Sequence, residues 1–156
     1  MLMNVIALPT EVAAAMRRRT RDDAGNELES ELQTAFGNPC RHCLRRANPG
    51  ERLILFSYSP FETQNPFKET GPIFVHADDC ARYSETHQLP PDFTAGPIVL
   101  RGYDAEQRIA RVSVVVDGQA PQRAQELLDD ISIAFIQARS FTHGCYLFRI
   151  ERPASP

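Results

Sequence analysis

The sequence lacks most of the features that would narrow its function. Its 156 residues contain no tryptophan, and no stretch approaches the roughly 20 apolar residues of a membrane-spanning helix. It contains neither of the phosphate-binding patterns G-x-G-x-x-G and G-x-x-x-x-G-K-[ST], and neither of the hydrolase patterns G-x-S-x-G and H-E-x-x-H. The sequence therefore gives no motif-based reason to predict a membrane protein, a nucleotide-binding fold or one of these hydrolases.

An excess of positive charge is also missing. The 17 lysines and arginines are outnumbered by 20 acidic residues, which gives a net charge of −3. Because nucleic-acid binding needs a clustered basic surface, we expect no nucleic-acid partner. One arginine group, residues 17–19 with Arg21, ends a predicted helix over residues 11–19, with Thr10 as its N-cap. It fits an anion contact or a solvated helix end, and we favour the second because helix C-termini attract cations.

No secretory signal is recognisable, because the apolar start of the chain has no positive residue before it. We therefore expect a cytoplasmic protein without a membrane partner, in a compartment where thiols stay reduced. The four cysteines are then free thiols, metal ligands or reactive groups rather than a disulfide framework. A homodimer is left open.

Twelve prolines and eight glycines predict several short elements joined by firm turns. Strands are predicted at residues 4–8, 52–58, 72–76, 97–103, 108–116, 132–139 and 145–150, and helices at 11–19, 78–83 and 121–131. Residues 27–32 fit an edge strand or a short helix. We predict an α+β fold: a single domain over residues 1–156 with a mostly antiparallel sheet, two or three flanking helices and a frayed tail at 152–156.

Two of these predictions concern burial. The continuous apolar stretch Leu53-Ile-Leu-Phe56 predicts a strand that is buried on both faces. The alternation of Ala110, Val112, Val114 and Val116 places these four side chains on one face of their strand.

Two pairs of metal-binding residues stand out. Cys40 and Cys43 are separated by two residues, and His76 and Cys80 by three. Three thiolates and one imidazole form a complete tetrahedral set for a structural zinc ion, so zinc is the cofactor that we predict for these four residues. Two observations oppose this prediction. Bulky Leu44 stands where zinc-binding turns often have glycine, and a histidine at the end of an apolar strand is more often hydrogen-bonded within a core.

A second hypothesis is a thiol-based redox protein or enzyme that uses Cys40 or Cys43. Positive side chains nearby would lower the pKa of a thiol, and they are Arg41, His42, Arg45 and Arg46. A thioredoxin-like site, however, would open a helix within a βαβ pattern, and no such pattern precedes Cys40.

A third hypothesis is a non-thiol enzyme or ligand-binding domain with a pocket lined by aromatic and arginine side chains. The residues predicted to line it are Tyr58, Phe61, Arg101 and Tyr103. His143 and Cys145 could also form a Cys/His pair, although catalytic partners usually come from distant segments of the chain. Whether the protein is an enzyme stays open.

Several stretches together resemble a bacterial family of uncharacterised proteins, the domain of unknown function 1203. They are Pro39-Cys-Arg-His-Cys-Leu44, Pro49-Gly-Glu51, Glu69-Thr-Gly-Pro-Ile-Phe-Val-His-Ala77 with Cys80 and Tyr83, Arg101-Gly-Tyr-Asp104, and Gly144-Cys-Tyr146 with Phe148-Arg-Ile-Glu-Arg152. The resemblance implies a bacterial, stand-alone domain, and it implies no activity and no catalytic residues. The function stays unknown, with a binding or interaction domain as the favoured class.

Overall fold

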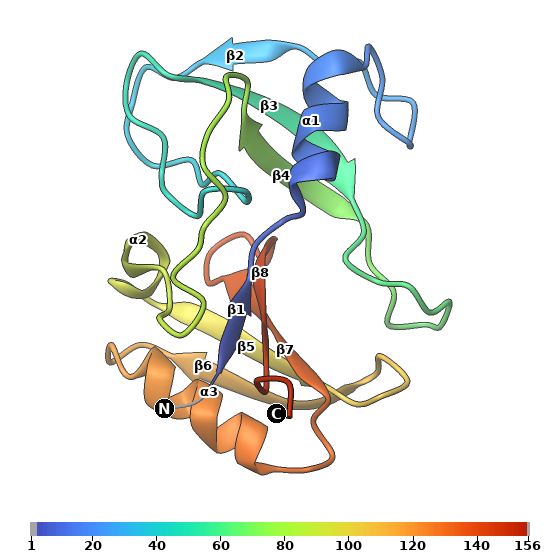
Figure 1. Cartoon of the computed structure of the whole chain (residues 1–156), viewed down its shortest axis with the longest axis vertical. Helices are drawn as coiled ribbons and strands as arrows, with labels where there is room; N and C mark the ends of the chain where they lie inside the picture. Colours follow the sequence, from blue (N-terminus) through green and yellow to red (C-terminus); the bar gives the residue numbers. More distant parts are fainter. Residues whose placement is uncertain (1–2, 156) are drawn as a thin grey trace.

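The computed structural model describes residues 3–155 and contains three helices and eight strands within them (Figure 1). The predictions for residues 1, 2 and 156 lie outside the described residues. The elements are β1 (Asn4–Ile6), α1 (Thr10–Arg18), β2 (Ser30–Leu32), β3 (Arg52–Tyr58), β4 (Gly71–His76), α2 (Pro91–Thr94), β5 (Ile98–Tyr103), β6 (Ile109–Val115), α3 (Ala120–Asp129), β7 (Phe135–Ser140) and β8 (Tyr146–Glu151). The predicted α+β class and the antiparallel pairing are confirmed.

The strands form two antiparallel sheets rather than one. The larger sheet has the strand order β1-β8-β7-β5-β6, and the smaller has the order β2-β3-β4. Helix α3 packs against β5, β6 and β7 of the larger sheet, and α1 packs against β3 of the smaller one. In Figure 1 the smaller sheet and α1 form the upper half of the molecule, and the larger sheet with α3 forms the lower half.

The two halves are interleaved along the chain. Strand β1 pairs with β8, so the two ends of the chain both belong to the larger sheet. The chain between them builds the smaller sheet and returns through α2. Each half has its own apolar cluster, and the cluster of the smaller half includes Cys40 and Cys43. The stretch from residue 38 to residue 83 contributes to both clusters, because Leu44 belongs to the cluster of the larger half.

The helix predicted at 78–83 is wrong. Residues 77–90 contain no helix, and the short helix α2 follows them. The backbone N–H of Tyr83 donates instead to the carbonyl of His42, at 2.9 Å, so this segment is held by a tertiary contact. The C-terminal limit of the helix predicted at 121–131 is also wrong, because α3 ends at Asp129 and Ile131 is 95% exposed.

Burial differs from the prediction on two strands. In β3 the side chain of Leu55 is 38% exposed, whereas its neighbours Ile54 and Phe56 are buried. In β6, Val112 and Val114 share one face as predicted, but they are 51% and 58% exposed. Helix α3 contacts β6, and buried Val115 lies on the opposite face of the strand from these valines. Alternation thus indicated the strand but not which face is covered.

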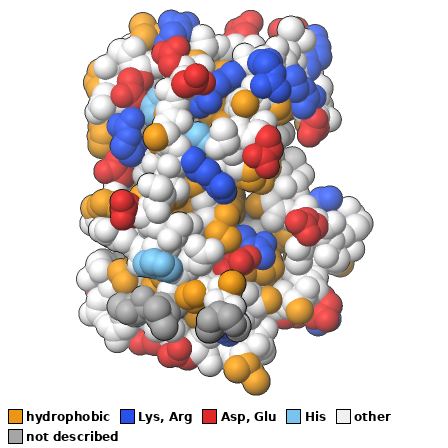
Figure 2. All heavy atoms as spheres, viewed as in Figure 1, with side chains coloured by type: hydrophobic (Ala, Val, Ile, Leu, Met, Phe, Trp, Pro, Cys, Tyr) orange, Lys and Arg blue, Asp and Glu red, His pale blue; other side chains and the backbone are white. Residues whose placement is uncertain are grey.

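The arginines at the end of α1 lie among acidic side chains. Arg17 pairs with Asp79, Arg19 with Asp23, and Arg21 with Glu27. At the upper right of the face drawn in Figure 2, Lys and Arg side chains stand beside Asp and Glu side chains. Thr10 is the first residue of α1 rather than its N-cap, which is Pro9. Within residues 3–155, no helix has the length and apolar character needed to cross a membrane.

Candidate metal centre

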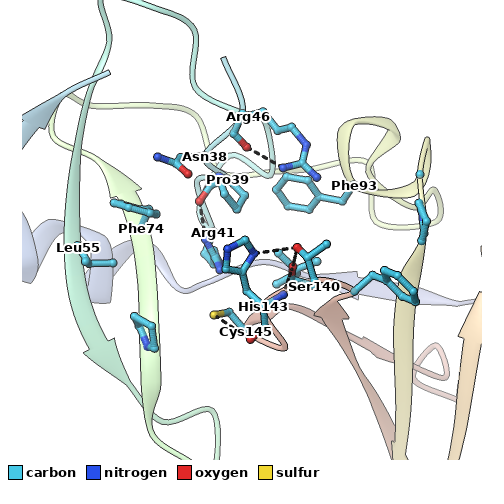
Figure 3. Close-up of a pocket in the computed structure, with 17 residues that line it drawn as sticks. Asn38, Pro39, Arg41, Arg46, Leu55, Phe74, Phe93, Ser140, His143 and Cys145 are labelled. Atoms are coloured by element: carbon cyan, nitrogen blue, oxygen red, sulfur yellow. Dashed lines mark hydrogen bonds between the residues drawn. The ribbon is translucent and has the colours of Figure 1, made fainter. Parts of the chain in front are cut away.

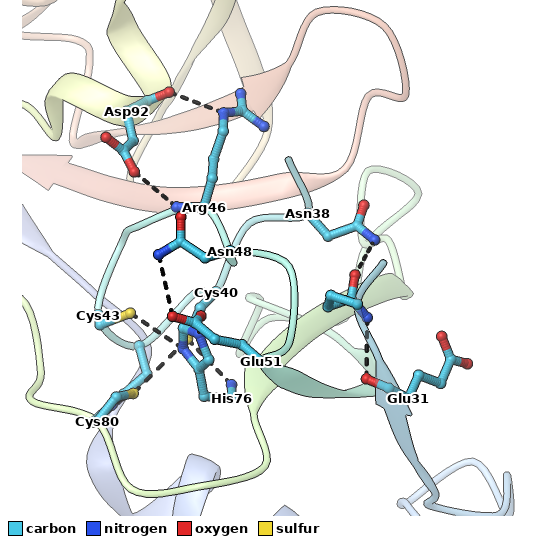
Figure 4. Close-up of polar contacts among 12 residues, drawn as sticks. Glu31, Asn38, Cys40, Cys43, Arg46, Asn48, Glu51, His76, Cys80 and Asp92 are labelled. Carbon is cyan, nitrogen blue, oxygen red and sulfur yellow. Dashed lines mark hydrogen bonds and ion pairs between the residues drawn. The ribbon is translucent and has the colours of Figure 1, made fainter. Parts of the chain in front are cut away.

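The structure brings together the two pairs of metal-binding residues that are separated in the sequence. One ligand atom from each of Cys40, Cys43, His76 and Cys80 lies within 4.8 Å of the other three (Figure 4). Cys40, Cys43 and His76 are buried, and Cys80 is partly exposed. The zinc hypothesis depends on the distance between the Cys40/Cys43 pair and the His76/Cys80 pair, and this distance is short.

The Cys40–Cys43 turn forms despite the leucine that follows it. The backbone N–H of Cys40 donates to Arg45 O at 2.9 Å, and that of Leu44 donates to Cys40 O at 3.0 Å. Leu44 has a φ of +54°, the left-handed conformation that glycine usually supplies. This conformation costs a non-glycine residue roughly 1–2 kcal/mol. Leu44 is only 1% exposed and belongs to the apolar cluster of the larger sheet, and this burial offsets the cost.

Strand β4 carries His76 to the same place. Its residue Phe74 forms a parallel bridge with Cys40, and the backbone N–H of Arg41 donates to Phe74 O at 3.0 Å. His76 is the last residue of β4 and pairs with Leu53 of β3. Cys80 follows in the irregular segment after the strand. Pairing with β4 therefore sets the position of the Cys40–Cys43 turn relative to His76.

The distances approach those of a tetrahedral zinc site. Zn–S bonds of about 2.3 Å place two sulfurs of a tetrahedron about 3.8 Å apart, and a sulfur and a nitrogen slightly closer. The Sγ atoms of Cys40 and Cys80 are 4.0 Å apart, and Cys43 Sγ lies 3.5 Å from His76 Nδ1. A sulfur-rich set with one imidazole is also the chemistry that zinc prefers. The residues present fit this metal.

Glu51 orients the histidine. His76 Nε2 and Glu51 Oε2 are 2.5 Å apart, and Asn48 Nδ2 donates to the other oxygen of Glu51 at 3.3 Å. The hydrogen bond to His76 is the main cause of a lowered pKa of Glu51, so the carboxylate is ionised at neutral pH. A carboxylate that accepts from one ring nitrogen leaves the other, here Nδ1, as a metal ligand.

A second histidine and an arginine surround Cys80. His42 Nδ1 lies 3.1 Å from Cys80 Sγ, and the other ring nitrogen of His42 lies 2.9 Å from Thr10 Oγ1. Arg17 Nη2 is 3.5 Å from the same sulfur, and Arg17 Nε donates to His76 O at 2.9 Å. Zinc with three thiolates and a neutral imidazole would carry a net charge of −1, which the guanidinium of Arg17 complements. Helix α1 thus contributes to the surroundings of the site.

The thiol and imidazole groups perturb one another. Hydrogen bonds from the side chains of Cys43 and then Cys80 lower the pKa of Cys40 far below its ordinary value. Interaction with Cys40 first, and then Cys80, raises the pKa of His76 to about 10. The pKa of Cys43 is raised, mainly because its side chain is hydrogen-bonded to Cys40. The three thiols and the imidazole share protons in a buried space, so some of the thiols are ionised. A bound cation would stabilise these thiolates.

The other candidate residues lie elsewhere. Phe61 and Tyr103 pack edge-on with ring centroids 5.5 Å apart in a buried aromatic cluster, and Arg101 pairs with Glu69. Of the four residues of the predicted aromatic pocket, only Tyr58 lines one of the four cavities described within residues 3–155, and that cavity is small, about 230 Å³. His143 and Cys145 do not belong to the metal-binding cluster. Both line a cavity of about 510 Å³ between the two sheets (Figure 3).

Glu51 and Arg17 were missed as parts of the site by sequence reasoning, whereas His42 was predicted only as a neighbour of the thiols. A signal existed for Glu51, because it lies just before β3 and the pairing of Leu53 with His76 brings it close to the end of β4. No comparable signal existed for Arg17, whose position depends on how α1 packs.

The fold and the site define the class of this protein: a small α+β domain with a Cys₃His cluster between the Cys40–Cys43 turn and the end of β4. The family model described as "Protein of unknown function (DUF1203)" matches residues 37–152, which include all four cluster residues, and the chain belongs to this family. Neither the curated proteins nor the solved structures contain a match to the chain.

Proposed function

We propose that this protein is a binding domain with a structural zinc ion held by Cys40, Cys43, His76 and Cys80. The single observation that carries the proposal is the convergence of four ligand atoms, from two separate segments, within 4.8 Å. The ion would tie the Cys40–Cys43 turn to the end of β4. That turn forms part of the wall of the cavity between the sheets, so the metal would hold the wall in place.

The composition of the site supports a structural rather than a catalytic ion. Structural zinc sites have four protein ligands, whereas catalytic sites leave one position for water or substrate. Here the protein supplies four ligands, and Cys40, Cys43 and His76 are each less than 7% exposed. The backbone N–H of His76 also donates to Cys40 Sγ at 3.3 Å, which would stabilise a thiolate ligand.

Metal analysis of protein purified without added zinc tests this proposal. We expect close to one zinc ion per chain in the parent protein and a loss of most of it in the Cys43→Ser variant. Cys145→Ser is the matched control, because Cys145 lies outside the cluster and its loss should leave the zinc content unchanged. Only trace metal in the parent, both as purified and after refolding with zinc, would refute a zinc centre.

The thiol-based alternative uses the same cysteines and is supported by the lowered pKa of Cys40. It is the weaker candidate because Cys40 is completely buried and Cys43 is 6% exposed, which leaves little access for a substrate. Alkylation rates against pH separate the two functions. In the protein as purified, a redox or nucleophilic cysteine would react with a midpoint well below 8.5, whereas a zinc-bound set would be protected until a chelator removes the metal.

A further inference from the structure

A buried positive charge lies in the wall of the cavity between the sheets. Arg41 lies in the turn between Cys40 and Cys43 and is only 3% exposed. Its Nε donates to Tyr146 O and its Nη1 to Pro39 O, both at 2.7 Å. Both acceptors are neutral carbonyls. Among residues 3–155, no carboxylate forms an ion pair with Arg41, and its Nη2 has no hydrogen-bond acceptor.

A buried guanidinium whose donors are not all bonded lowers the stability of the folded protein. Buried charges in proteins are usually paired or coordinated, because an uncompensated buried ion costs several kcal/mol. The guanidinium cannot avoid this cost by losing its proton under ordinary conditions. The thiolate of Cys40 lies nearby and interacts with this charge, but it does not accept from Nη2. An anion that enters the cavity would supply the missing hydrogen-bond acceptor.

The rest of the cavity is largely apolar. Leu55 and Phe74, which are paired neighbours on β3 and β4, line it from the smaller sheet, and Phe93 and Leu147 line it from the other half. This explains why Leu55 is exposed on a strand that was predicted to be buried. Figure 3 shows side chains from both halves around the space between the sheets. The volume of about 510 Å³ is typical of a small-molecule site.

Apart from Asn38 and the two arginines, the polar side chains of the lining come from one turn. Ser140, Thr142 and His143 lie on the turn between β7 and β8 and all line the cavity. The second cation of the lining, Arg46, is bonded in the same way, with Nη1 donating to Gly37 O at 2.7 Å and Nε to Asp92 O at 3.0 Å, but it is partly exposed, so water can solvate it. Among the described residues of the lining, Arg41 is therefore the buried cation whose Nη2 lacks an acceptor.

We propose that this cavity binds an organic acid with one carboxylate and an apolar body. The carboxylate accepts a hydrogen bond from Nη2 of Arg41, and the body packs against Leu55, Phe74 and Phe93. A single buried guanidinium edge suits a monoanion, whereas phosphate would require further buried cations, and Arg46 is partly exposed. This inference deepens the proposed function, because it names the ligand class of the binding domain and depends on the turn that zinc would hold.

Alkylation of Cys145 provides a readout at the site itself, since Cys145 lines the cavity and is partly exposed. The full-length, zinc-loaded chain is treated with iodoacetamide, and peptide mass spectrometry gives the rate at Cys145. The probes are octanoate and naphthalene-2-carboxylate, their carboxamides, and inorganic phosphate, each at 2 mM. We expect at least one carboxylate to slow the reaction threefold or more. At 2 mM ligand, a threefold slowing corresponds to a Kd of about 1 mM. Its carboxamide and phosphate should have no effect.

Arg41→Met should abolish the protection by the carboxylate. Arg45→Met is the matched control, because Arg45 is exposed on the same turn and does not line the cavity. If Arg41→Met does not fold, as judged by circular dichroism, the comparison of acid with amide in the parent protein still decides whether charge is required.

Three results would overturn the inference: no protection by either carboxylate, equal protection by acid and amide, or unchanged protection in a folded Arg41→Met. Protection by phosphate equal to that by the acids would overturn it as well. Zinc is measured in the same samples, so its presence without carboxylate protection refutes only the ligand. Absence of zinc refutes the proposed metal centre.

Discussion

Replacing Glu51 by glutamine tests whether the carboxylate next to His76 supports metal binding. The substitution keeps the size of the side chain and removes its charge, which weakens the 2.5 Å contact with His76 Nε2. Hydrogen bonds to charged groups contribute roughly 1.5–3 kcal/mol. The Glu51 side chain is 31% exposed, and glutamine can still accept a hydrogen bond, so the lower end of that range applies. At about 1.4 kcal/mol per factor of ten, we expect zinc affinity to fall about tenfold.

The assay is competition for zinc with a chromophoric chelator of known affinity at pH 7 and constant salt. Glu29→Gln is the matched control, since Glu29 is an exposed carboxylate outside the cluster and makes no ion pair among the described residues. Its zinc affinity should equal that of the parent. Equal affinity of Glu51→Gln and the parent would show that the carboxylate does not orient a metal-binding histidine.

Two further predictions concern stability. Asp22 accepts hydrogen bonds from the backbone N–H groups of Ser57 and Asn26, which lower its pKa from 3.8 to about 2. Urea unfolding should show Asp22→Asn destabilised by about 1–2 kcal/mol at pH 7, with exposed Asp23→Asn nearly neutral. The depressed pKa of Asp22 stabilises the fold above pH 3.8, and this contribution is lost as the pH falls through about 2. The difference in unfolding free energy between the parent and Asp22→Asn should therefore shrink between pH 4 and pH 2. A constant difference would contradict this. At Leu44, whose φ is +54°, Leu44→Gly should be about 1 kcal/mol more stable than Leu44→Ala, and the reverse order would argue against a left-handed residue there.

The convergence of Cys40, Cys43, His76 and Cys80 could be predicted from the sequence because thiols and imidazoles at short spacings are rare and chemically specific. The absence of a glycine after Cys43 counted against the site, yet Leu44 adopts the left-handed conformation and buries its side chain. Local preference was overcome by tertiary packing, which no pattern along the chain reports.

The parts of the site that sequence reasoning missed depend on strand register and helix packing. Glu51 and Arg17 contact His76 only because β3 pairs with β4 in a particular register and α1 packs across β3. The cavity was missed because its lining comes from both sheets, and the sequence predicted a single sheet. The segment at 78–83 failed as a helix because its backbone follows the Cys40–Cys43 turn, with Tyr83 bonded to His42.

X-ray absorption at the zinc edge tests the central claim most directly, because it reports the atoms bound to the metal. A site formed by Cys40, Cys43, His76 and Cys80 predicts three sulfurs at about 2.3 Å and one nitrogen at about 2.0–2.1 Å. His76→Ala should remove the outer-shell scattering of the imidazole ring, and with it part of the spectrum, or lose the metal. A first shell with fewer than three sulfurs, or a spectrum that is unchanged in His76→Ala, would contradict the proposed ligand set.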